Sequence, residues 1–280
     1  MLQVQKIDAL ELPDLAPYRT LRRPLEHRQQ GIFVAEGERV VRRLLESEFA
    51  VVSVLLPEKW LEVYEPLIRR RSEEIRAFIA EKSLLERLTG FSMYQGVLAV
   101  GRIPNQPDIE TILRGKGRPA LLAALDGLSN AENVGGLVRT SAAFGVQALL
   151  ASRNCCSPFL RRAVRSSMGA VFRLPVVEDL DLAQTLSRLR ESGFHCIAAH
   201  PRCDSRALME TDFTSDICVV FGSEGGGIST EVLVRCNVAV AIPMASGVDS
   251  LNVASAAAAF LYEANRQHRI ARMNQAPTPA

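Results

Sequence analysis

The stretch Val219-Val-Phe-Gly-Ser-Glu-Gly-Gly-Gly-Ile-Ser229 places an apolar run directly before a glycine-rich loop that contains Glu224. A short apolar run is typical of a buried strand, and glycines after it let the backbone approach a ligand closely. The loop lacks the Gly-Lys-Ser/Thr of a phosphate-binding P-loop, and Glu224 interrupts the glycine spacing of dinucleotide-binding loops. A carboxylate here suits a hydroxyl, an amide or a cationic sulfonium. The stretch therefore predicts a ligand site at a strand end that is not a phosphate site.

Outward from this stretch, apolar runs alternate with helical patterns through the second part of the chain. The runs cover residues 120–125, 146–151, 172–177, 194–199, 217–221 and 238–242, and helical spacing covers residues 133–144, 158–168 and 182–192. Continuous apolar strands with intervening helices predict a parallel α/β sheet covered on both faces. Ligands bind such sheets at the carboxyl ends of the strands. Polar, glycine-containing clusters follow Leu125, Phe221 and Ile242, so we expect the functional site there.

A segment rich in proline and glycine, residues 103–119, separates this part from the first part of the chain. Helical spacing at residues 38–46 and apolar runs at residues 51–56 and 97–100 predict a small α/β domain in the first part. The C-terminal tail lacks apolar periodicity, which predicts disorder. The expected organisation is a first domain over 1–105, a linker over 106–118, a second domain over 119–270 and a disordered tail over 271–280.

Composition limits the classes of function. Hydrophobic residues make up 48% of the 280-residue chain, and no apolar run is long enough for a membrane span, so we expect a soluble cytoplasmic protein. The six cysteines form no Cys-x-x-Cys pair and the four histidines are scattered, so we expect no metal site. A net charge of +2 is too small to indicate nucleic-acid binding by itself. Any RNA-binding surface would come from local clusters, for which Arg22/Arg23, Arg42/Arg43, Arg69 to Arg71 and Arg161/Arg162/Arg165 are candidates.

Two further polar clusters lie at the predicted strand ends. The first runs from Asp126 to Arg139, and Asn133 has the side chain expected at a helix N-cap. In the other, a strand ends at Pro243, a glycine-containing loop follows, and an alanine-rich helix begins near Ser250. Taken singly, each cluster also fits an ordinary capped helix at the surface.

Together and in this order, the three clusters resemble the motifs of SPOUT-class RNA ribose methyltransferases of the SpoU–TrmH family. The resemblance covers residues 119–265. It rests on Asn133-x-Gly135-x-x-x-Arg139, on Gly222-x-Glu224-x-x-Gly227, and on Ile242-Pro-Met followed by Ser250-Leu-Asn252-Val. It implies a parallel sheet with a trefoil knot, S-adenosyl-L-methionine as cofactor, methyl transfer to a ribose 2′-hydroxyl of RNA, and a homodimer formed through the C-terminal domain.

The resemblance also implies roles for individual residues. Arg139 would stand at the catalytic centre, as a base or as a clamp that holds an RNA phosphate and stabilises the developing alkoxide. A guanidinium pKa above about 12 makes the role of base costly. The other catalytic positions would be Asn133, Glu224, Ser250 and Asn252, and the cofactor-binding positions would be Gly222, Ile242, Met244, Gly247 and Leu251.

The N-terminal part adds a weaker resemblance. Tyr18-Arg19, Arg28 and Gly31-Ile-Phe-Val-Ala-Glu36-Gly37 are similar to the small RNA-binding domain that precedes many members acting on ribosomal RNA. We therefore expect a ribosomal-RNA enzyme. Two alternatives stay open, namely a transfer-RNA ribose methyltransferase and a non-catalytic RNA-binding module that kept the fold. The glycine spacing speaks against a dinucleotide-dependent dehydrogenase.

Overall fold

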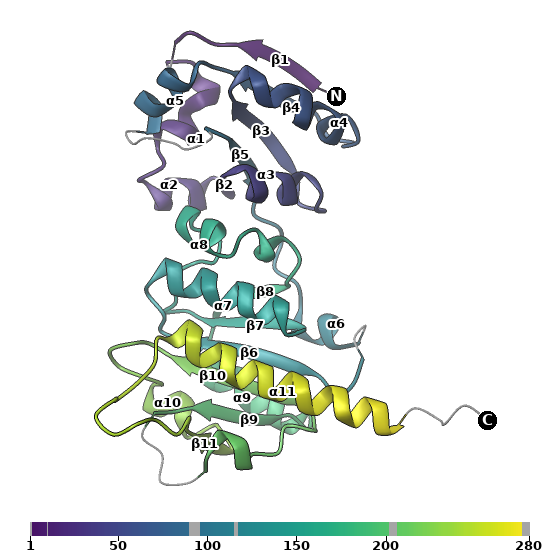
Figure 1. The fold of residues 1–280 in the computed structure, drawn as a ribbon, viewed down its shortest axis with the longest axis vertical. Helices are drawn as coiled ribbons and strands as arrows, with labels where there is room; N and C mark the ends of the chain where they lie inside the picture. The colour runs from purple at the N-terminus through teal and green to yellow at the C-terminus, as the bar shows by residue number, and fades with distance from the viewer. Residues whose placement is uncertain (1, 10, 90–95, 115–116, 202–205, 276–280) are drawn as a thin grey trace, which may run out of the picture. The chain divides into compact units, whose positions relative to one another are not determined.

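The computed structural model describes residues 2–9, 11–89, 96–114, 117–201 and 206–275. The chain forms two compact units (Figure 1). The first consists of residues 1–105 together with Pro158–Arg173, and the second consists of Gln106–Ser157 and Leu174–Ala280. The first unit therefore includes residues 158–173, which the sequence pattern predicts to be part of the second domain.

The first unit is built on a five-stranded sheet in the order β1-β4-β3-β5-β2. Strands β1, β4 and β3 run parallel, and β5 runs antiparallel to both β3 and β2. The strands are β1 (Leu2–Lys6), β2 (Ile32–Glu36), β3 (Val51–Leu56), β4 (Ile75–Ile79) and β5 (Leu98–Arg102), and the α-helices are α1 (Ala16–Arg19), α2 (Pro24–Gln29), α3 (Glu38–Leu45), α4 (Leu61–Arg69), α5 (Lys82–Thr89) and α8 (Arg161–Ser166).

Aromatic packing explains why residues 158–173 belong to the first unit. The rings of Phe159 and Phe172 pack with those of Phe33 and Phe49, with centroids 5.4 to 6.1 Å apart. Such pairs bury a large apolar area and add their own ring–ring attraction. Gly101 lies against the ring of Phe33, where a side chain would not fit. The segment thus completes an aromatic core that residues 1–105 provide only in part.

An ion pair adds to this attachment. Glu36 is buried at the end of β2, and its carboxylate accepts hydrogen bonds from Arg165, at 2.8 Å, and from Arg161, both on α8. A buried carboxylate is stable only when it is paired and hydrogen-bonded. The buried Glu36 carboxylate therefore requires the arginines of α8 as partners, although these lie more than 120 residues away in the sequence.

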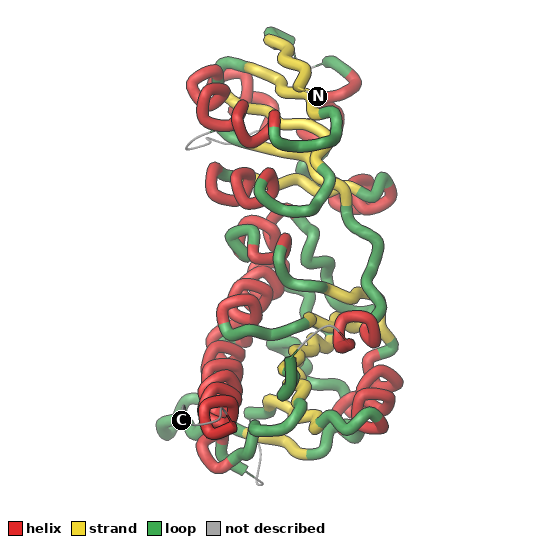
Figure 2. Tube along the Cα trace, turned by 90° about the vertical axis from the view of Figure 1, so that its right-hand side faces the viewer, coloured by secondary structure: helices red, strands yellow, loops and turns green. Residues whose placement is uncertain are grey.

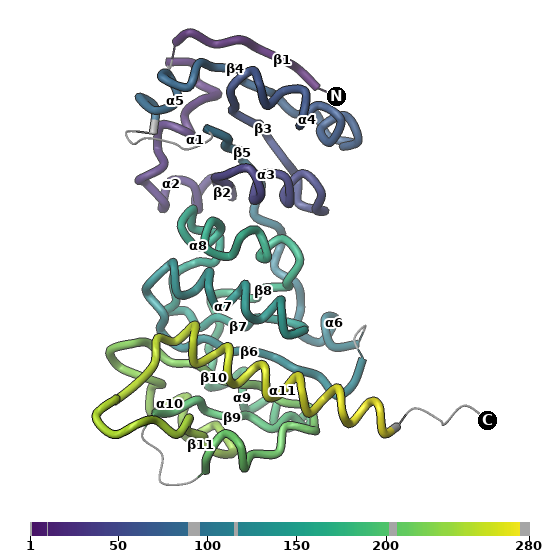
Figure 3. Tube along the Cα trace, in the orientation of Figure 1, coloured from purple at the N-terminus to yellow at the C-terminus, as the bar shows by residue number. Residues whose placement is uncertain are grey.

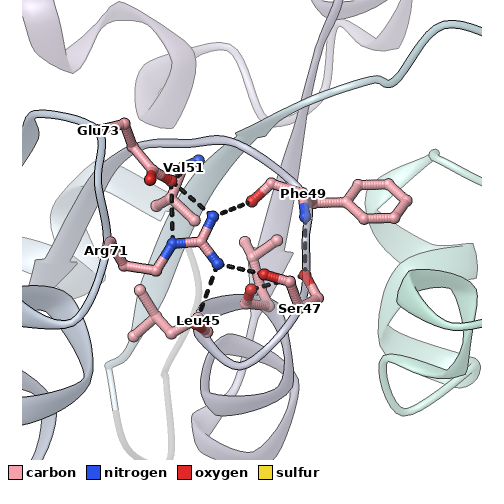
Figure 4. Close-up of polar contacts among 7 residues, drawn as sticks. Leu45, Ser47, Phe49, Val51, Arg71 and Glu73 are labelled. Carbon is pink, nitrogen blue, oxygen red and sulfur yellow. Dashed lines mark hydrogen bonds and ion pairs between the residues drawn. The ribbon is translucent and has the colours of Figure 1, made fainter.

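Arg71, a largely buried arginine, organises the loop between α3 and β3 (Figure 4). The Arg71 guanidinium donates to the carbonyl oxygens of Leu45 at 3.2 Å, of Ser47, and of Phe49 at 2.7 Å. It also donates to Glu73 at 2.6 and 3.0 Å. The ring of Phe49 points away from this guanidinium. Arg71 thereby fixes the backbone from which Phe49 enters the aromatic cluster.

The second unit is built on a six-stranded sheet in the order β11-β9-β10-β6-β7-β8. Every strand pair in it is parallel, so the prediction of a parallel α/β sheet is confirmed. The strands are β6 (Leu121–Asp126), β7 (Ala148–Ser152), β8 (Val176–Leu180), β9 (His195–Ala199), β10 (Ile217–Gly222) and β11 (Val238–Val240), and the α-helices are α6 (Ile109–Arg114), α7 (Ala131–Ala143), α9 (Leu182–Glu191), α10 (Thr230–Leu233) and α11 (Val253–Gln275).

Helices cover both faces of this sheet (Figure 2). On one face α11 lies beside α7, and a side chain at Gly136 of α7 would come within 3.1 Å of the Ala254 methyl group. Small residues therefore let these two helices approach closely. On the other face, Leu182, Leu186 and Leu189 of α9 pack in a core with inward residues of the strands. Among the described residues, no helix combines the length and the apolar character that crossing a membrane requires.

The structure corrects several predicted boundaries. Strand β8 begins at Val176 rather than at Phe172, because Phe172 ends a short 3-10 helix and packs in the aromatic cluster of the first unit. The predicted linker contains helix α6. Helix α11 begins at Val253 rather than near Ser250, and it continues to Gln275. Residues 271–275 are thus helical rather than part of a disordered tail, and residues 276–280 lie outside the described ones.

The C-terminal half of α11 carries a buried histidine with a testable pH effect. The His268 ring donates to the Ser215 carbonyl at 3.0 Å, and burial, together with nearby Arg272, lowers the pKa of His268. The unfolded chain binds this proton near pH 6.5, so stability should be lost as the pH falls below about 6.5. We expect His268→Gln, which keeps a donor, to lose less melting temperature between pH 7.5 and 5.5 than the wild type does.

In His268→Gln, the fall in melting temperature between pH 7.5 and 5.5 should be smaller than in the wild type but should not disappear. Burial also lowers the pKa of His27 and His195, which remain in the variant. Calorimetric melting of both proteins at the two pH values provides the measurement. An equal drop in both proteins would show that His268 does not contribute.

Candidate active site

A cavity of about 520 Å³ lies at the carboxyl ends of β9, β10 and β11. Its volume falls within the range of about 300–1,000 Å³ that is typical of small-molecule sites. Its lining comes from residues 199–201, 221–228, 242, 244 and 249–253, with Ala256 and Phe260 of α11. The site is therefore at the sheet edge that the strand ends predicted, and two of the three polar clusters line it.

The loop after β10 is a closed turn with Glu224 near its tip. The backbones of Ser223 and Gly227 exchange two hydrogen bonds, of 3.0 and 2.9 Å, and the Ser223 hydroxyl accepts from Gly226 N–H at 3.2 Å. A side chain at Gly222 would come within 2.1 Å of the Gly227 carbonyl carbon. Gly222 thus permits the loop to fold back on its own strand, and this closure presents Glu224 at the surface of the cavity.

The third loop runs between β11 and α11 (Figure 3). Its residues Ile242, Met244 and Leu251 line the cavity. Among the residues that the structure describes, none forms a backbone hydrogen bond with the main-chain groups of these three. Main-chain groups that line a cavity without partners are available to a ligand. Gly247 turns this loop with a φ of 84°, but it does not belong to the cavity lining.

Side chains from all three clusters meet beside the cavity. The Asn133 amide of α7 donates to the Glu224 carboxylate, and the Asn252 amide donates to the Asn133 oxygen at 3.0 Å. The Asn252 oxygen in turn accepts from Ala254 N–H at 2.9 Å, at the start of α11. Asn252 and Ser250 both line the cavity. The structure therefore joins Asn133, Glu224 and Asn252 into one hydrogen-bonded chain.

The prediction that Asn133 caps α7 is wrong. The N-cap is Asn130, whose side-chain oxygen accepts from Glu132 N–H at 2.8 Å and from Asn133 N–H at 3.2 Å. A cap must precede the first helical turn, and α7 begins at Ala131. Because Asn130 satisfies the helix terminus, the Asn133 side chain is available for Glu224 and Asn252.

Arg139 lies apart from the cavity lining, on the exposed side of α7. It is six residues after Asn133, which is about 9 Å along the helix axis. Within the described parts of the chain, no hydrogen bond or ion pair involves its guanidinium. The structure thus leaves this cation available to a group that approaches from solvent.

Sequence reasoning missed the residues that hold the loop after β6. Gly127 N–H donates to the Ser152 hydroxyl at 3.1 Å, and Leu128 N–H donates to the Cys155 sulfur at 3.3 Å. The Cys155 thiol in turn donates to the Leu125 carbonyl at 3.3 Å. These contacts fix the loop that carries Asn130. In the sequence, these two residues appear as a serine and a cysteine near the end of a strand. This pattern is too common to indicate that they hold a neighbouring loop.

Two further thiols, Cys196 and Cys236, lie outside the cavity lining. Burial raises the pKa of the Cys196 and Cys236 thiols to about 12, so both thiols are protonated near neutral pH. Among the described residues, no three histidine, cysteine or acidic side chains are grouped closely enough to hold a metal ion.

Comparisons with known proteins place this geometry in a family. The model of the SpoU rRNA Methylase family matches residues 120–262. An uncharacterized tRNA/rRNA methyltransferase of Mycobacterium tuberculosis is 34% identical over 274 residues, which are 95% of this chain and 93% of the relative. The 23S rRNA (guanosine-2′-O-)-methyltransferase RlmB of Acinetobacter baylyi is 31% identical over 215 residues, covering 75% of this chain and 84% of RlmB.

Solved structures agree with this relationship. The SpoU methyltransferase AviRb from Streptomyces viridochromogenes, in complex with the cofactor AdoMet, has a TM-score of 0.78 at 25% identity, over 92% of this chain and 99% of AviRb. The family model covers just over half of the chain and includes all three motifs. The chain therefore belongs to the SpoU rRNA methylase family and is an RNA methyltransferase, as the motifs predicted.

Proposed function

We propose that this protein transfers a methyl group from S-adenosylmethionine to a ribose 2′-hydroxyl of ribosomal RNA. The observation that carries the proposal is the hydrogen-bonded chain of Asn133, Glu224 and Asn252 beside a cavity with unpaired main-chain groups. The named relative RlmB is a 23S rRNA 2′-O-methyltransferase, and AviRb binds AdoMet, which supports both the reaction and the cofactor.

The cavity residues fit this cofactor. The free main-chain groups of Ile242, Met244 and Leu251 can pair with the edge of an adenine, and their side chains provide an apolar wall for its faces. The Glu224 carboxylate suits a neighbouring positive charge. When bound, S-adenosylmethionine supplies an electrophilic methyl group on a sulfonium. Gly222 allows the second loop to fold closely along the cavity, and Gly247 turns the third loop.

The reaction needs a ribose oxygen held in line and relieved of its proton. Asn133 and Glu224 would orient the ribose, while Ser250 and Asn252 anchor the third loop against α7. A guanidinium is a poor base, so Arg139 would act as a clamp that binds an RNA phosphate and stabilises the alkoxide as it develops. Holding the reacting groups in place can supply several kcal/mol of the rate enhancement.

The first unit would bind the RNA substrate. Arg162 of α8 and Arg28 of α2 are exposed in it, and exposed arginines can contact RNA phosphates. These residues support an RNA-binding role without selecting the RNA. Ribosomal RNA is favoured by the RlmB relationship, and transfer RNA is the second candidate because several relatives carry the name tRNA/rRNA methyltransferase.

Transfer of tritium from labelled S-adenosylmethionine to purified RNA pools tests the proposal. The RNA comes from cells that lack the protein, and digestion to nucleosides identifies the product. We expect label in ribosomal RNA as a 2′-O-methylnucleoside, a strongly reduced rate of labelling with Glu224→Gln, and full label with Arg188→Ala, an exposed arginine on α9. Label in transfer RNA alone would select the second candidate. Cofactor binding without label in either pool would indicate a non-catalytic RNA-binding module.

We further propose that the segment from β11 into α11 forms the trefoil knot of this class. A single cavity is lined by residues from three separate segments of the chain, namely 199–201, 221–228, and 242, 244 and 249–253. Strand β11 also lies beside β9 and not beside β10, which precedes it in the chain. Both features suit a C-terminal segment threaded past an earlier loop.

A homodimer formed through α11 is the expected state in solution. Tyr262, Ile270 and Met273 of this helix are exposed, by 57%, 46% and 75%. Exposed apolar side chains in a row on one helix suit a partner surface. We expect light scattering to give a dimer at micromolar concentration, and the double variant Ile270→Glu/Met273→Glu to give a monomer.

The control replaces Leu25, an equally exposed apolar residue on α2, by glutamate, and it should remain dimeric. A wild-type protein that is monomeric at micromolar concentration and fully active would contradict the dimer.

A further inference from the structure

Asp126 is a buried carboxylate to which the proposed reaction gives no role. It is the last residue of β6, and only 7% of it is exposed. In the register of the sheet it lies opposite Gly222 of β10. Its Oδ2 accepts a hydrogen bond from Ser229 N–H at 2.8 Å, more than 100 residues further along the chain.

These two contacts place Asp126 at both ends of the loop that carries Glu224. Strand pairing with β6 holds the loop where it begins, at Gly222. The Asp126 side chain holds it where it ends, at Ser229, just before α10. Between these points the loop contains four glycines, at 222, 225, 226 and 227. Glycines give a loop the largest backbone freedom, so its shape depends strongly on such anchors.

We propose that Asp126 is a positioning residue for methyl transfer. Its carboxylate fixes Ser229, and the closed loop then keeps Glu224 in contact with Asn133 and, through Asn133, with Asn252. Without this acceptor, Ser229 N–H loses its partner and the exit of the loop is released. The inference rests on the proposed function, because it assigns Asp126 an effect on Glu224 and Asn133.

The chemistry of the contact determines which substitutions are informative. The bond needs an oxygen acceptor of the right length at position 126, and asparagine retains one whereas alanine does not. We therefore expect Asp126→Asn to keep kcat within about threefold of the wild type and Asp126→Ala to lower it about tenfold or more. Tritium transfer at saturating RNA and cofactor gives kcat, and thermal melting confirms that each variant is folded.

A double-variant cycle separates positioning from general destabilisation. If Asp126 acts through Glu224, then Asp126→Ala/Glu224→Gln should lose no more activity than Glu224→Gln alone. A loss that multiplies in the double variant would overturn the inference, and so would an Asp126→Ala enzyme with wild-type kcat. If Glu224→Gln alone keeps wild-type kcat, the proposed function fails instead, so the two failures are distinguishable.

Ser229→Pro provides a second route should Asp126→Ala fail to fold. The φ of Ser229 is −61°, which proline adopts, so the substitution removes the N–H donor at a backbone angle that proline tolerates. We expect this variant to show the same loss of kcat. The double variant Ser229→Pro/Glu224→Gln should again lose no more activity than Glu224→Gln alone. A folded Ser229→Pro enzyme with wild-type kcat would overturn the role of the contact.

Discussion

Replacing Arg139 by alanine is expected to slow methyl transfer by about a hundredfold or more while affinity for S-adenosylmethionine stays unchanged. Arg139 lies on the exposed side of α7 and outside the cavity lining, so its loss leaves the cofactor site intact. Its proposed task is to stabilise charge that develops only in the transition state. Removing such a group lowers the rate constant without a matching loss of ground-state binding.

The opposite pattern is expected for Leu251→Arg, because Leu251 lines the cavity and a bulky charge there would block the cofactor. Calorimetry gives the affinity and tritium transfer gives the rate for both variants, with Arg188→Ala as the neutral control. A near wild-type rate in the Arg139→Ala enzyme would show that Arg139 takes no part in methyl transfer. Equal loss of affinity in both folded variants would contradict the division between chemistry and cofactor binding.

Replacing Arg71 by alanine should destabilise the first unit by about 3 kcal/mol. The substitution leaves the carbonyls of Leu45, Ser47 and Phe49 without their shared donor and removes the cation beside Glu73 (Figure 4). Removing one partner of this partly buried ion pair leaves the other without its compensating charge. Thermal or urea unfolding provides the measurement, and the adjacent exposed Arg70→Ala is the matched control. Equal stability of the two variants would contradict a structural role for Arg71.

The pair of Arg71 and Glu73 also predicts that the stability of the first unit depends on pH. Partial burial acts to raise the pKa of the Glu73 carboxyl, but hydrogen bonds from Arg71 and from Val51 N–H outweigh it and lower this pKa below its usual value. The resulting stabilisation is present above about pH 4.5 and is lost as the pH falls through the lowered pKa. In Arg71→Ala this part of the acid sensitivity should be smaller, which unfolding measured between pH 6 and pH 3 would reveal.

The second unit was largely predictable because its signals are local. Strands of a parallel sheet covered by helices are continuous apolar runs, so β6, β7, β9, β10 and β11 follow from the pattern of apolar residues. Parallel strands carry their loops to one edge, which is why the second and third clusters meet at one cavity. The strand ends predict that Asn133, Glu224 and Asn252 lie close together. They do not predict which of these side chains donates a hydrogen bond to which.

The missed features depend on partners that are distant in the sequence. Strands β1 and β4 were not predicted, because the pattern of β1 is mostly polar and exposed and β4 is a short run interrupted by Arg76. Asn130 and Asn133 are both plausible caps, and only the helix start distinguishes them. The role of Asp126 depends on Ser229, for which no local pattern exists.

The discontinuity of the first unit has a consequence for how the protein is made. Residues 1–105 leave the ribosome without Phe159, Phe172 and the two arginines that neutralise Glu36. At about 5–20 residues per second, the missing segment follows about 3 to 14 seconds later. During this interval a partly built aromatic core and an unpaired carboxylate are exposed. A nascent chain stalled after residue 105 should therefore be open to proteases and chaperones, and the first unit should become protected only when residue 173 has emerged.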